Sequence, residues 1–199
     1  IMENLPKIGK IRRVTFQMCQ YSSRYDKFKN GIIENAFRPE LSNGSLMDIG
    51  VYCVHPMVKI LGKPDRVMAS CVKLHNGVDG MGTILASYDE QGAQAELIYS
   101  KITDSPVPSQ IQGEDGTMYM ESLPILTKVW IRYRDKSRED ISFELEDPGN
   151  NMNYEIAEFM RIAEANGSAE THNQYSVWEM QVMDEARRQM GIVFPADRG

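Results

Sequence analysis

Cysteine is scarce in this sequence of 199 residues, which holds three: Cys19, Cys53 and Cys71. The number is odd, the spacing is wide and no C-x-x-C pair occurs, so the sequence offers neither the ligand spacing of a zinc site nor a disulfide framework. We expect reduced, mostly buried thiols, as in a cytoplasmic protein.

Excess positive charge and long apolar runs are also missing. The 22 Lys and Arg against 28 Asp and Glu give a net charge of -6 and a pI near 5.2, which is unlike the basic surface of a nucleic-acid-binding protein. No apolar run approaches the roughly 18 residues of a membrane span. Residues 1–4 lack the charged-then-apolar order of a signal peptide. We therefore expect a cytoplasmic protein with neither nucleic acid nor membrane as a partner.

The length fits one domain, because a chain of this size buries about 70% of its unfolded surface. Residues Ile11–Ser22 show the alternation of a half-buried strand. Residues 23–43 are charged and rich in breakers, which predicts a long irregular excursion. From Gly44 to Gly62 the apolar spacing is helical, and Pro56 either kinks this helix or opens a second one.

Short strand patterns fill the second half of the chain. Turn residues separate them, and no segment of crossover length lies between them, so consecutive strands should pair antiparallel. The predicted strands are Val67–Leu74, Gly82–Tyr88, Ala93–Ile102, Ser109–Gln112, Thr117–Glu121, Thr127–Tyr133 and Asp140–Glu144.

The chain ends with two helical patterns. Tyr154–Ala165 has apolar residues at helical spacing, and Ser176 with Glu179 forms a capping box that predicts a second helix from there to about Met190. Together these elements predict an α+β fold, an open and mainly antiparallel sheet with helices on one face.

The stretch from Asn43 to Pro56 carries the strongest chemical signal. On a helix, Asp48, Tyr52 and His55 stand at i, i+4 and i+7, so they should share one face. Such a triplet suits a cleft in which protons are exchanged. An aspartate near a helix start, an amphipathic tyrosine and a structural histidine explain the same residues, so the spacing leaves both interpretations open.

The segment Gly44–Tyr52, with its sequence D-I-G-V-Y from Asp48, is similar to the D-x-G-x-H/Y motif in the second domain of Gfo/Idh/MocA oxidoreductases. Its tyrosine version looks most like the dihydrodiol dehydrogenase and sugar dehydrogenase branch. Ile8–Val14, Ile111–Gly116 and the closing helices resemble the family in the same order. The resemblance implies that residues 1–199 form a single C-terminal substrate-binding and oligomerisation domain. Its fold would be that of the C-terminal domain of glyceraldehyde-3-phosphate dehydrogenase, and the N-terminal Rossmann domain would be absent from this chain.

Chemically, the resemblance implies a full-length NAD(P)-dependent oxidoreductase that moves a hydride between nicotinamide and a sugar, polyol or diol. Tyr52 would be the acid/base and Asp48 would orient the substrate. A free phenol titrates near pH 10, so such a group needs a nearby cation, which the family supplies from an E-K-P motif. This chain has no E-K-P and no G-x-G-x-x-G turn before a helix. NAD or NADP should be bound mainly by the missing domain and should interact weakly or not at all with the isolated chain. We therefore expect the isolated chain to be inactive.

The resemblance also suggests substrate contacts from His55, Phe37 and Arg38. His55 suits a substrate hydroxyl and the end of a helical segment before Pro56 equally well. Tyr21, Arg24, Phe37 and Arg38 are candidates for lining the site because loops often supply specificity, although solvated loop charges explain them as well.

Two positions depart from the family's pattern. Asn43 replaces the first of two glycines, which predicts an asparagine in a left-handed turn. Tyr52 replaces the histidine of the inositol dehydrogenase branch, so the resemblance does not imply the substrates of that branch.

A sheet with a helix-free face needs a partner, and the family typically pairs subunits there, so we expect a homodimer or homotetramer. The rival hypothesis is a non-catalytic binding or assembly module on the same fold. A metal-dependent hydrolase built on Asp48 and His55 is disfavoured, since two ligands fall short of the three that catalytic zinc takes. We therefore predict no metal site.

Overall fold

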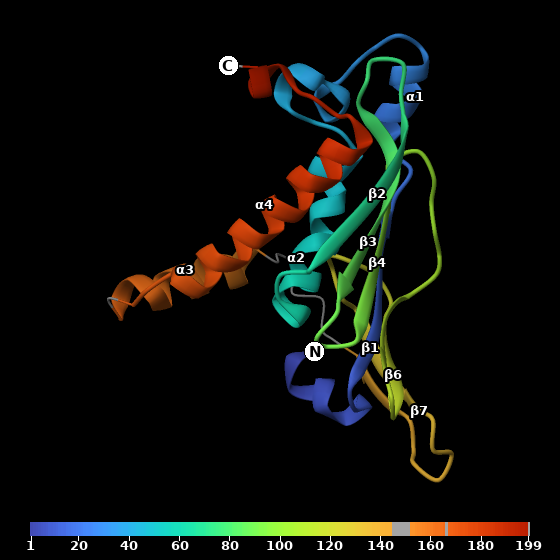
Figure 1. Ribbon diagram of the computed structural model, residues 1–199, viewed down its shortest axis with the longest axis vertical. Helices are drawn as coiled ribbons and strands as arrows, with labels where there is room; N and C mark the ends of the chain where they lie inside the picture. Colours follow the sequence, from blue (N-terminus) through green and yellow to red (C-terminus); the bar gives the residue numbers. More distant parts are fainter. Residues whose placement is uncertain (145–151, 166, 199) are drawn as a thin grey trace.

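An eight-stranded sheet forms the frame of the chain in this computed structural model, which describes residues 1–144, 152–165 and 167–198. The strand order is β2-β3-β4-β1-β5-β6-β7-β8, and Figure 1 shows helices α2 and α4 on one side of the sheet. The predicted fold, an open and mainly antiparallel α+β sheet, is confirmed. The strands are β1 (Ile11–Cys19), β2 (Arg66–Lys73), β3 (Asp79–Tyr88), β4 (Ala93–Ser100), β5 (Ser109–Gly113), β6 (Gly116–Met120), β7 (Lys128–Tyr133) and β8 (Ile141–Glu144).

Every strand predicted from the alternating pattern is present, with ends displaced by no more than three residues. Burial explains this agreement. Along β3, for example, buried and half-buried residues alternate, as they must when one face of a sheet packs on a core.

The pairing contains one parallel exception among the described strands. Strand β1 runs parallel to β4 and antiparallel to β5, whereas the other neighbours are all antiparallel. After β1 the chain crosses the face of the sheet through α2 (Val51–Leu61) before it enters β2. A connection of that length permits parallel pairing, so β1 lies in the middle of the sheet and joins two antiparallel halves.

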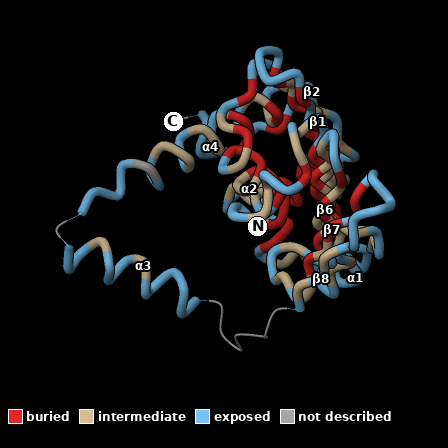
Figure 2. The backbone as a smooth tube through the Cα atoms, turned by 90° about the horizontal axis from the view of Figure 1, so that it is seen from below, coloured by how far each residue is buried: buried red, intermediate tan, exposed pale blue. Residues whose placement is uncertain are grey.

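The core lies between the sheet and two helices, α2 and α4 (Glu170–Met190). Figure 2 shows this buried layer beside helix surfaces that are exposed. Helix α2 fills it with five buried side chains, and α4 adds four near its middle and end. The helix residues that reach the core are Cys53, Val54, Met57, Val58 and Leu61 from α2, and Val182, Met183, Ala186 and Met190 from α4.

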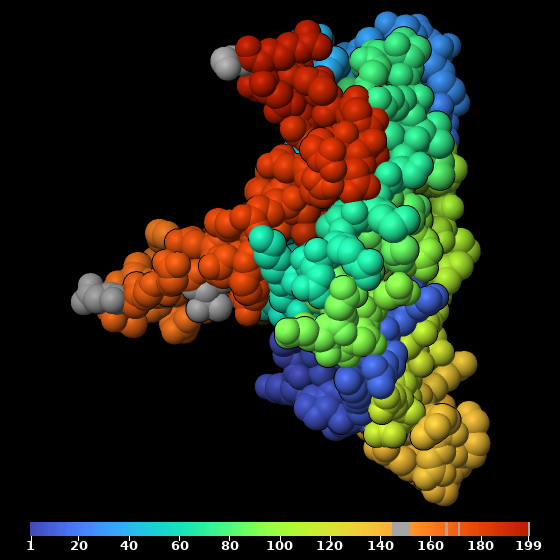
Figure 3. All heavy atoms as spheres, viewed as in Figure 1, coloured from blue at the N-terminus to red at the C-terminus, as the bar shows by residue number. Residues whose placement is uncertain are grey.

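Helix α3 (Met152–Glu164) and the first part of α4 form an arm that projects from this body (Figure 3). Helix α3 has no buried residue, and Tyr154, Ile156 and Phe159 are each more than half exposed. The helix predicted at Tyr154–Ala165 is therefore present, but it adds nothing to the described core.

The prediction for residues 23–43 is wrong in part. This segment contains helix α1 (Ser23–Lys29), capped by the Ser22 hydroxyl, which accepts a hydrogen bond from the Arg24 amide at 3.3 Å. The capping serine had been grouped with the preceding strand, which concealed the helix. Short 3-10 helices occupy Met2–Ile8, Asn35–Phe37, Pro39–Leu41 and Pro195–Arg198.

The predicted start of the last helix is also wrong. Helix α4 begins at Glu170, so Ser176 lies in its second turn and caps nothing. Glu179 makes an ion pair with His55 of α2 instead. The predicted end at Met190 is confirmed, with Gly191 in the left-handed conformation that closes many helices.

The described cysteines are free, with Cys53 buried and the other two partly so. Within the described residues, no helix is both long and apolar enough to cross a bilayer.

Candidate active site

The segment that carries Asp48 begins at a close contact between Gly44 and Asp79. Asp79, the first residue of β3, is 1% exposed, and its Oδ2 accepts a hydrogen bond from the Leu46 amide at 2.6 Å. A Cβ on Gly44 would collide with the other oxygen, so this approach requires glycine. Burial raises the pKa of Asp79, and hydrogen bonds from the Leu46 and Ser45 amides oppose the rise. Asp79 thus caps the segment from a distant strand.

The helical segment then opens with one turn of π-helix, Leu46–Gly50, before α2 follows as regular α-helix. Gly50 lies against Tyr99 of β4, where a Cβ would come within 3.1 Å of the ring and 2.9 Å of Leu46 Cδ1. The glycine of the D-I-G sequence therefore lets this turn rest on the sheet. A π-turn holds an extra residue and turns the side chains before it relative to those after it.

Asp48 opens on a polar pocket of about 310 Å³, which we call the Asp48 pocket. Its Oδ2 forms an ion pair with Lys101, whose side chain is 4% exposed, while the Asp48 side chain is 38% exposed. Burial and the neighbouring Arg24 guanidinium lower the pKa of Lys101 to about 8. The carboxylate therefore has a buried cation behind it and open space before it. The pocket is lined by Gln20, Tyr21, Ser22, Ser23, Arg24, Asp48, Ile49 and Lys101.

Tyr52 and His55 line a different pocket of about 540 Å³, which we call the Tyr52 pocket. Tyr52 is 42% exposed, and His55 Nδ1 lies 2.6 Å from Oε2 of Glu179, a largely buried residue of α4. Apart from these three residues and Ser176 the lining is apolar, comprising Ile1, Phe16, Val51, Pro56, Ile60, Met120, Leu123, Pro124 and Leu126.

The prediction that Asp48, Tyr52 and His55 share one face is therefore wrong for Asp48. The π-turn lies between Asp48 and the regular helix, so the i, i+4 relation to Tyr52 does not hold as it does in an α-helix. Tyr52 and His55, both in regular helix, do share a pocket. Pro56 neither ends nor restarts α2, which runs through it.

The residues predicted from the preceding loop separate into three environments. Phe37 is fully buried, and its ring centroid lies 5.4 Å from Lys101 Nζ, so direct substrate contact by Phe37 is contradicted. Arg38 lies in another pocket, with its Nε donating to the Ile33 carbonyl. Tyr21 and Arg24 line the Asp48 pocket, although the Tyr21 hydroxyl already bonds Asp26 and Lys29.

The left-handed residue in the turn before the site is Ser42, with φ of 53°, and Asn43 does not have a positive φ. The expectation for Asn43 is therefore displaced by one residue. Asn43 is followed by Gly44, whose lack of a side chain serves the Asp79 contact.

Lys101, Asp79 and Glu179 were not predicted as site residues. Lys101 follows directly after β4, and a lysine at the end of an apolar strand pattern was a signal that it occupies a special position. Asp79 and Glu179 carried no comparable signal, because a turn aspartate and a helix glutamate are common surface residues.

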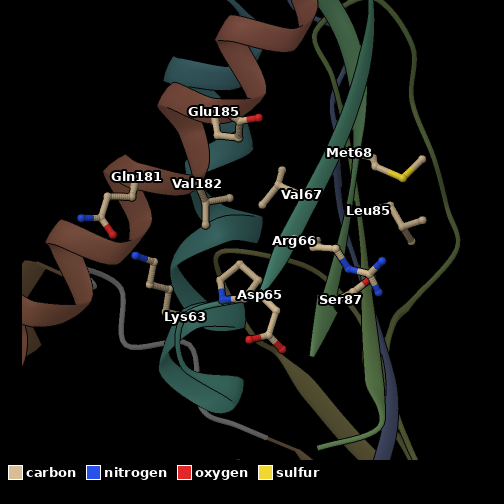
Figure 4. A pocket seen from close by; sticks show the side chains of 11 residues that line it. Lys63, Asp65, Arg66, Val67, Met68, Leu85, Ser87, Gln181, Val182 and Glu185 are labelled. Atoms are coloured by element: carbon tan, nitrogen blue, oxygen red, sulfur yellow. The ribbon is translucent and has the colours of Figure 1, made fainter. Parts of the chain in front are cut away.

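A further pocket of about 550 Å³ lies between α4 and β2 (Figure 4). Lys63, Asp65, Arg66 and Glu185 line it with apolar residues between them, and none of the predicted site residues reaches it. Among the described residues no group of three or more His, Cys, Asp or Glu is arranged to hold a metal ion.

Comparisons with known proteins agree with this fold. A sequence profile described as the GFO/IDH/MocA C-terminal domain matches residues 6–119. The chain is 48% identical over 200 aligned residues to the scyllo-inositol 2-dehydrogenase (NADP(+)) IolU of Bacillus subtilis (strain 168). That alignment covers all of this chain and 60% of the relative. The trans-1,2-dihydrobenzene-1,2-diol dehydrogenase of Danio rerio is 26% identical over 178 residues, covering 83% of this chain and 52% of the relative.

Among solved structures, KijD10, a 3-ketoreductase from Actinomadura kijaniata crystallised with NADP and TDP-benzene, superposes with a TM-score of 0.75. It is 19% identical and is matched over 94% of this chain and 57% of its own, which supports the fold alone. The chain thus spans about 60% of the length of IolU and about half that of the diol dehydrogenase. On the profile match and the identity to IolU, the chain belongs to the GFO/IDH/MocA C-terminal domain family.

Proposed function

We propose that this chain is the C-terminal, substrate-binding domain of an oxidoreductase that transfers hydride between NAD or NADP and a sugar, polyol or diol. Tyr52 is the acid/base of the reaction and Asp48 orients the substrate. The names of the relatives support the substrate class, since they include an inositol dehydrogenase and diol dehydrogenases, and IolU supports NADP.

One observation carries the proposal: a carboxylate and a phenol, four residues apart, both reach solvent from a segment that is otherwise packed. The Asp48 side chain is 38% exposed and Tyr52 is 42% exposed, whereas Leu46, Ile49 and Cys53 are buried. Both polar groups open on pockets, where binding and catalytic groups are expected.

Tyr52 suits proton transfer because its phenol lies at the mouth of an apolar pocket. In such surroundings a hydroxyl exchanges its proton with a bound substrate oxygen rather than with bulk water. His55, held by Glu179 at 2.6 Å, lines the same pocket and supplies a second hydrogen-bonding group. We assign it to the substrate.

Asp48 suits substrate binding because its carboxylate is paired on one side only. Lys101 contacts Oδ2, and an ionised carboxylate accepts strong hydrogen bonds from neutral hydroxyl groups. Arg24 lines the same pocket, and its guanidinium group donates hydrogen bonds to substrate hydroxyl oxygens. An acceptor and a donor in one small pocket match neighbouring hydroxyl groups of a ring or chain.

The dinucleotide, when bound, supplies or accepts the hydride. No glycine-rich strand-to-helix turn occurs in the described residues to hold its phosphates, so a separate nucleotide-binding half must do so. Val51 and Leu123, both partly buried residues of the Tyr52 pocket, offer an apolar wall that would suit the flat face of a nicotinamide ring.

The test is NADP and NAD reduction by the full-length protein with scyllo-inositol, sugars and diols as candidate substrates. Tyr52→Phe should lower turnover about 100-fold or more, the usual effect of losing a positioned acid/base. The control is Tyr119→Phe, since Tyr119 stacks on Trp130 of β7 at 5.2 Å and lines neither pocket. Near wild-type turnover in Tyr52→Phe would overturn the assignment, and a wild-type protein inert on the whole panel would favour a non-catalytic binding or assembly module.

The same proposal includes self-association through the sheet face that α2 and α4 leave uncovered. Tyr119 and Trp130 stack on the sheet and are only partly buried, and Met68 of β2 is 65% exposed. Partly buried residues of this kind suit a subunit interface. Light scattering of the full-length protein should give a dimer or tetramer, and a charge introduced by Trp130→Glu should reduce it to monomers.

A further inference from the structure

A buried cation lies behind the Asp48 carboxylate. Lys101 follows β4, and its amide donates to the Gly80 carbonyl at 2.9 Å while its own carbonyl accepts from the Ser22 amide at 2.9 Å. The residue is thus fixed between the start of β3 and the cap of α1. The main chain from which the ammonium group extends is therefore held on both sides.

The ammonium group has two partners in the described chain, the Asp48 carboxylate and the face of Phe37, whose centroid is 5.4 Å away. A charged amine that is 4% exposed would be costly without a counter-ion. The nearby Arg24 adds like charge, and together with burial it lowers the pKa of Lys101 to about 8. The Asp48 carboxylate is the counter-ion of this buried ammonium group.

This ion pair occupies only one of the two oxygens of the Asp48 carboxylate. Lys101 contacts Oδ2, and the second oxygen has no hydrogen-bond partner among the described residues. The residue is partly exposed and lines a pocket of about 310 Å³. An oxygen that is fixed in place, charged and unpartnered is a ready acceptor for a hydroxyl donor.

We propose that Lys101 is a positioning residue for substrate: it holds the Asp48 carboxylate in one orientation, so that the free oxygen accepts a hydroxyl group of an uncharged polyhydroxylated substrate. The inference rests on the proposed function. It goes further because it names the residue that prepares the carboxylate, and because it excludes a carboxylated substrate, whose anionic group the free oxygen would repel.

The test compares steady-state kinetics of full-length variants with the best substrate of the panel. Lys101→Met removes the charge and keeps an unbranched chain. It should raise KM at least tenfold with a smaller change in kcat, because binding of the hydroxyl group weakens. Lys101→Arg should recover most of the lost affinity. Lys59→Met, which removes an exposed lysine of α2 that lines neither pocket, should leave both constants within twofold.

A role in packing alone predicts a different pattern. Loss of packing would lower the amount of folded protein and leave the KM of the folded fraction unchanged, and that result would overturn the inference. If Lys101→Met does not fold, Asp48→Asn combined with Lys101→Met removes both charges and takes its place. This double variant should bind substrate no worse than Asp48→Asn alone, because the lysine acts through the carboxylate. Additive losses would contradict it.

Tyr52→Phe separates this failure from failure of the proposed function. Loss of turnover in Tyr52→Phe with an unchanged KM in both Lys101 variants would refute only the role of Lys101. Full turnover in Tyr52→Phe would refute the proposed reaction itself.

Discussion

The Asp48 pocket and the Tyr52 pocket lie along the same helical segment, yet they have opposite character. The first holds a carboxylate, a buried ammonium group and a guanidinium group within about 310 Å³, and the second holds a phenol, an imidazole, the Glu179 carboxylate and the Ser176 hydroxyl among nine apolar or proline residues. Four residues separate Asp48 from Tyr52 in the sequence. The π-turn and two sets of neighbours, the start of α1 on one side and α4 with residues 123–126 on the other, make the environments differ.

Under the proposed function, this difference corresponds to a division of labour. A polar pocket with fixed charges suits binding of hydroxyl groups and orientation of a substrate, whereas an apolar pocket beside a phenol suits proton transfer with limited exchange with water. On this proposal one helical segment carries both the binding group and the reacting group.

The largest expected effect comes from removing the carboxylate. Asp48→Ala takes away the hydroxyl acceptor and leaves the Lys101 ammonium buried without its counter-ion. We expect kcat/KM for a polyol to fall about 100-fold to 1,000-fold, on the scale of a lost charged hydrogen bond in an active site. Steady-state kinetics of the full-length protein measures this, and a change of less than threefold would show that the Asp48 pocket is not where substrate binds.

The capping contact that starts the segment should show in stability. Asp79→Ala removes the acceptor for the Leu46 amide, and Gly44→Ala collides with the Asp79 carboxylate. Each should lower the free energy of unfolding by about 2 kcal/mol in urea denaturation. In the double variant the collision is gone, so the two losses should be less than additive. Strict additivity would mean that these residues act independently.

The carboxylate of the Tyr52 pocket belongs to Glu179. Glu179→Gln keeps the shape but removes the charge 2.6 Å from His55, so the imidazole should lose its fixed orientation. We expect turnover to fall roughly tenfold, at the low end for groups that hold an active-site histidine. Glu185→Gln on the same helix, where the glutamate pairs with exposed Arg188, is the matched control. If both variants change turnover equally, Glu179 has no specific role in orienting His55 and only links α4 to α2.

The smallest effect is a pH dependence confined to the polar pocket. The pKa of Lys101 is lowered to about 8, below that of the unfolded chain, so the unfolded state binds more protons between these values. The contribution of Lys101 to stability therefore rises as pH rises through this window. Between about pH 7 and pH 9 the wild type should gain about 1 kcal/mol relative to Lys101→Met. Urea unfolding at both pH values measures the difference, and equal slopes for the two proteins would contradict the shift.

The sequence predicted the sheet well because the pattern there is local. Alternating burial along strands such as β3 is visible in the residues themselves. The parallel pairing of β1 with β4 was not visible, since it joins residues about 80 positions apart. The early start of α4 was missed because the first turn of that helix projects from the body, and only from Tyr175 onward do its apolar residues reach the core.

The sequence pointed to Asp48 and Tyr52 as candidate site residues but not to their arrangement. The D-I-G-V-Y sequence located Asp48 and Tyr52, but no rule of spacing foretells a π-turn, which arises where Gly50 settles on Tyr99 and Asp79 takes the Leu46 amide. Lys101 joins Asp48 across 53 positions of sequence. Such a pair exists only once the sheet has formed.

The most direct test of the central claim compares Asp48→Asn with Tyr52→Phe on one substrate, in the same full-length protein. If the two pockets divide the work, Asp48→Asn should act chiefly by raising KM, and Tyr52→Phe should act chiefly by lowering kcat at nearly unchanged KM. The same pattern of change in both variants would contradict the division of labour between the two pockets.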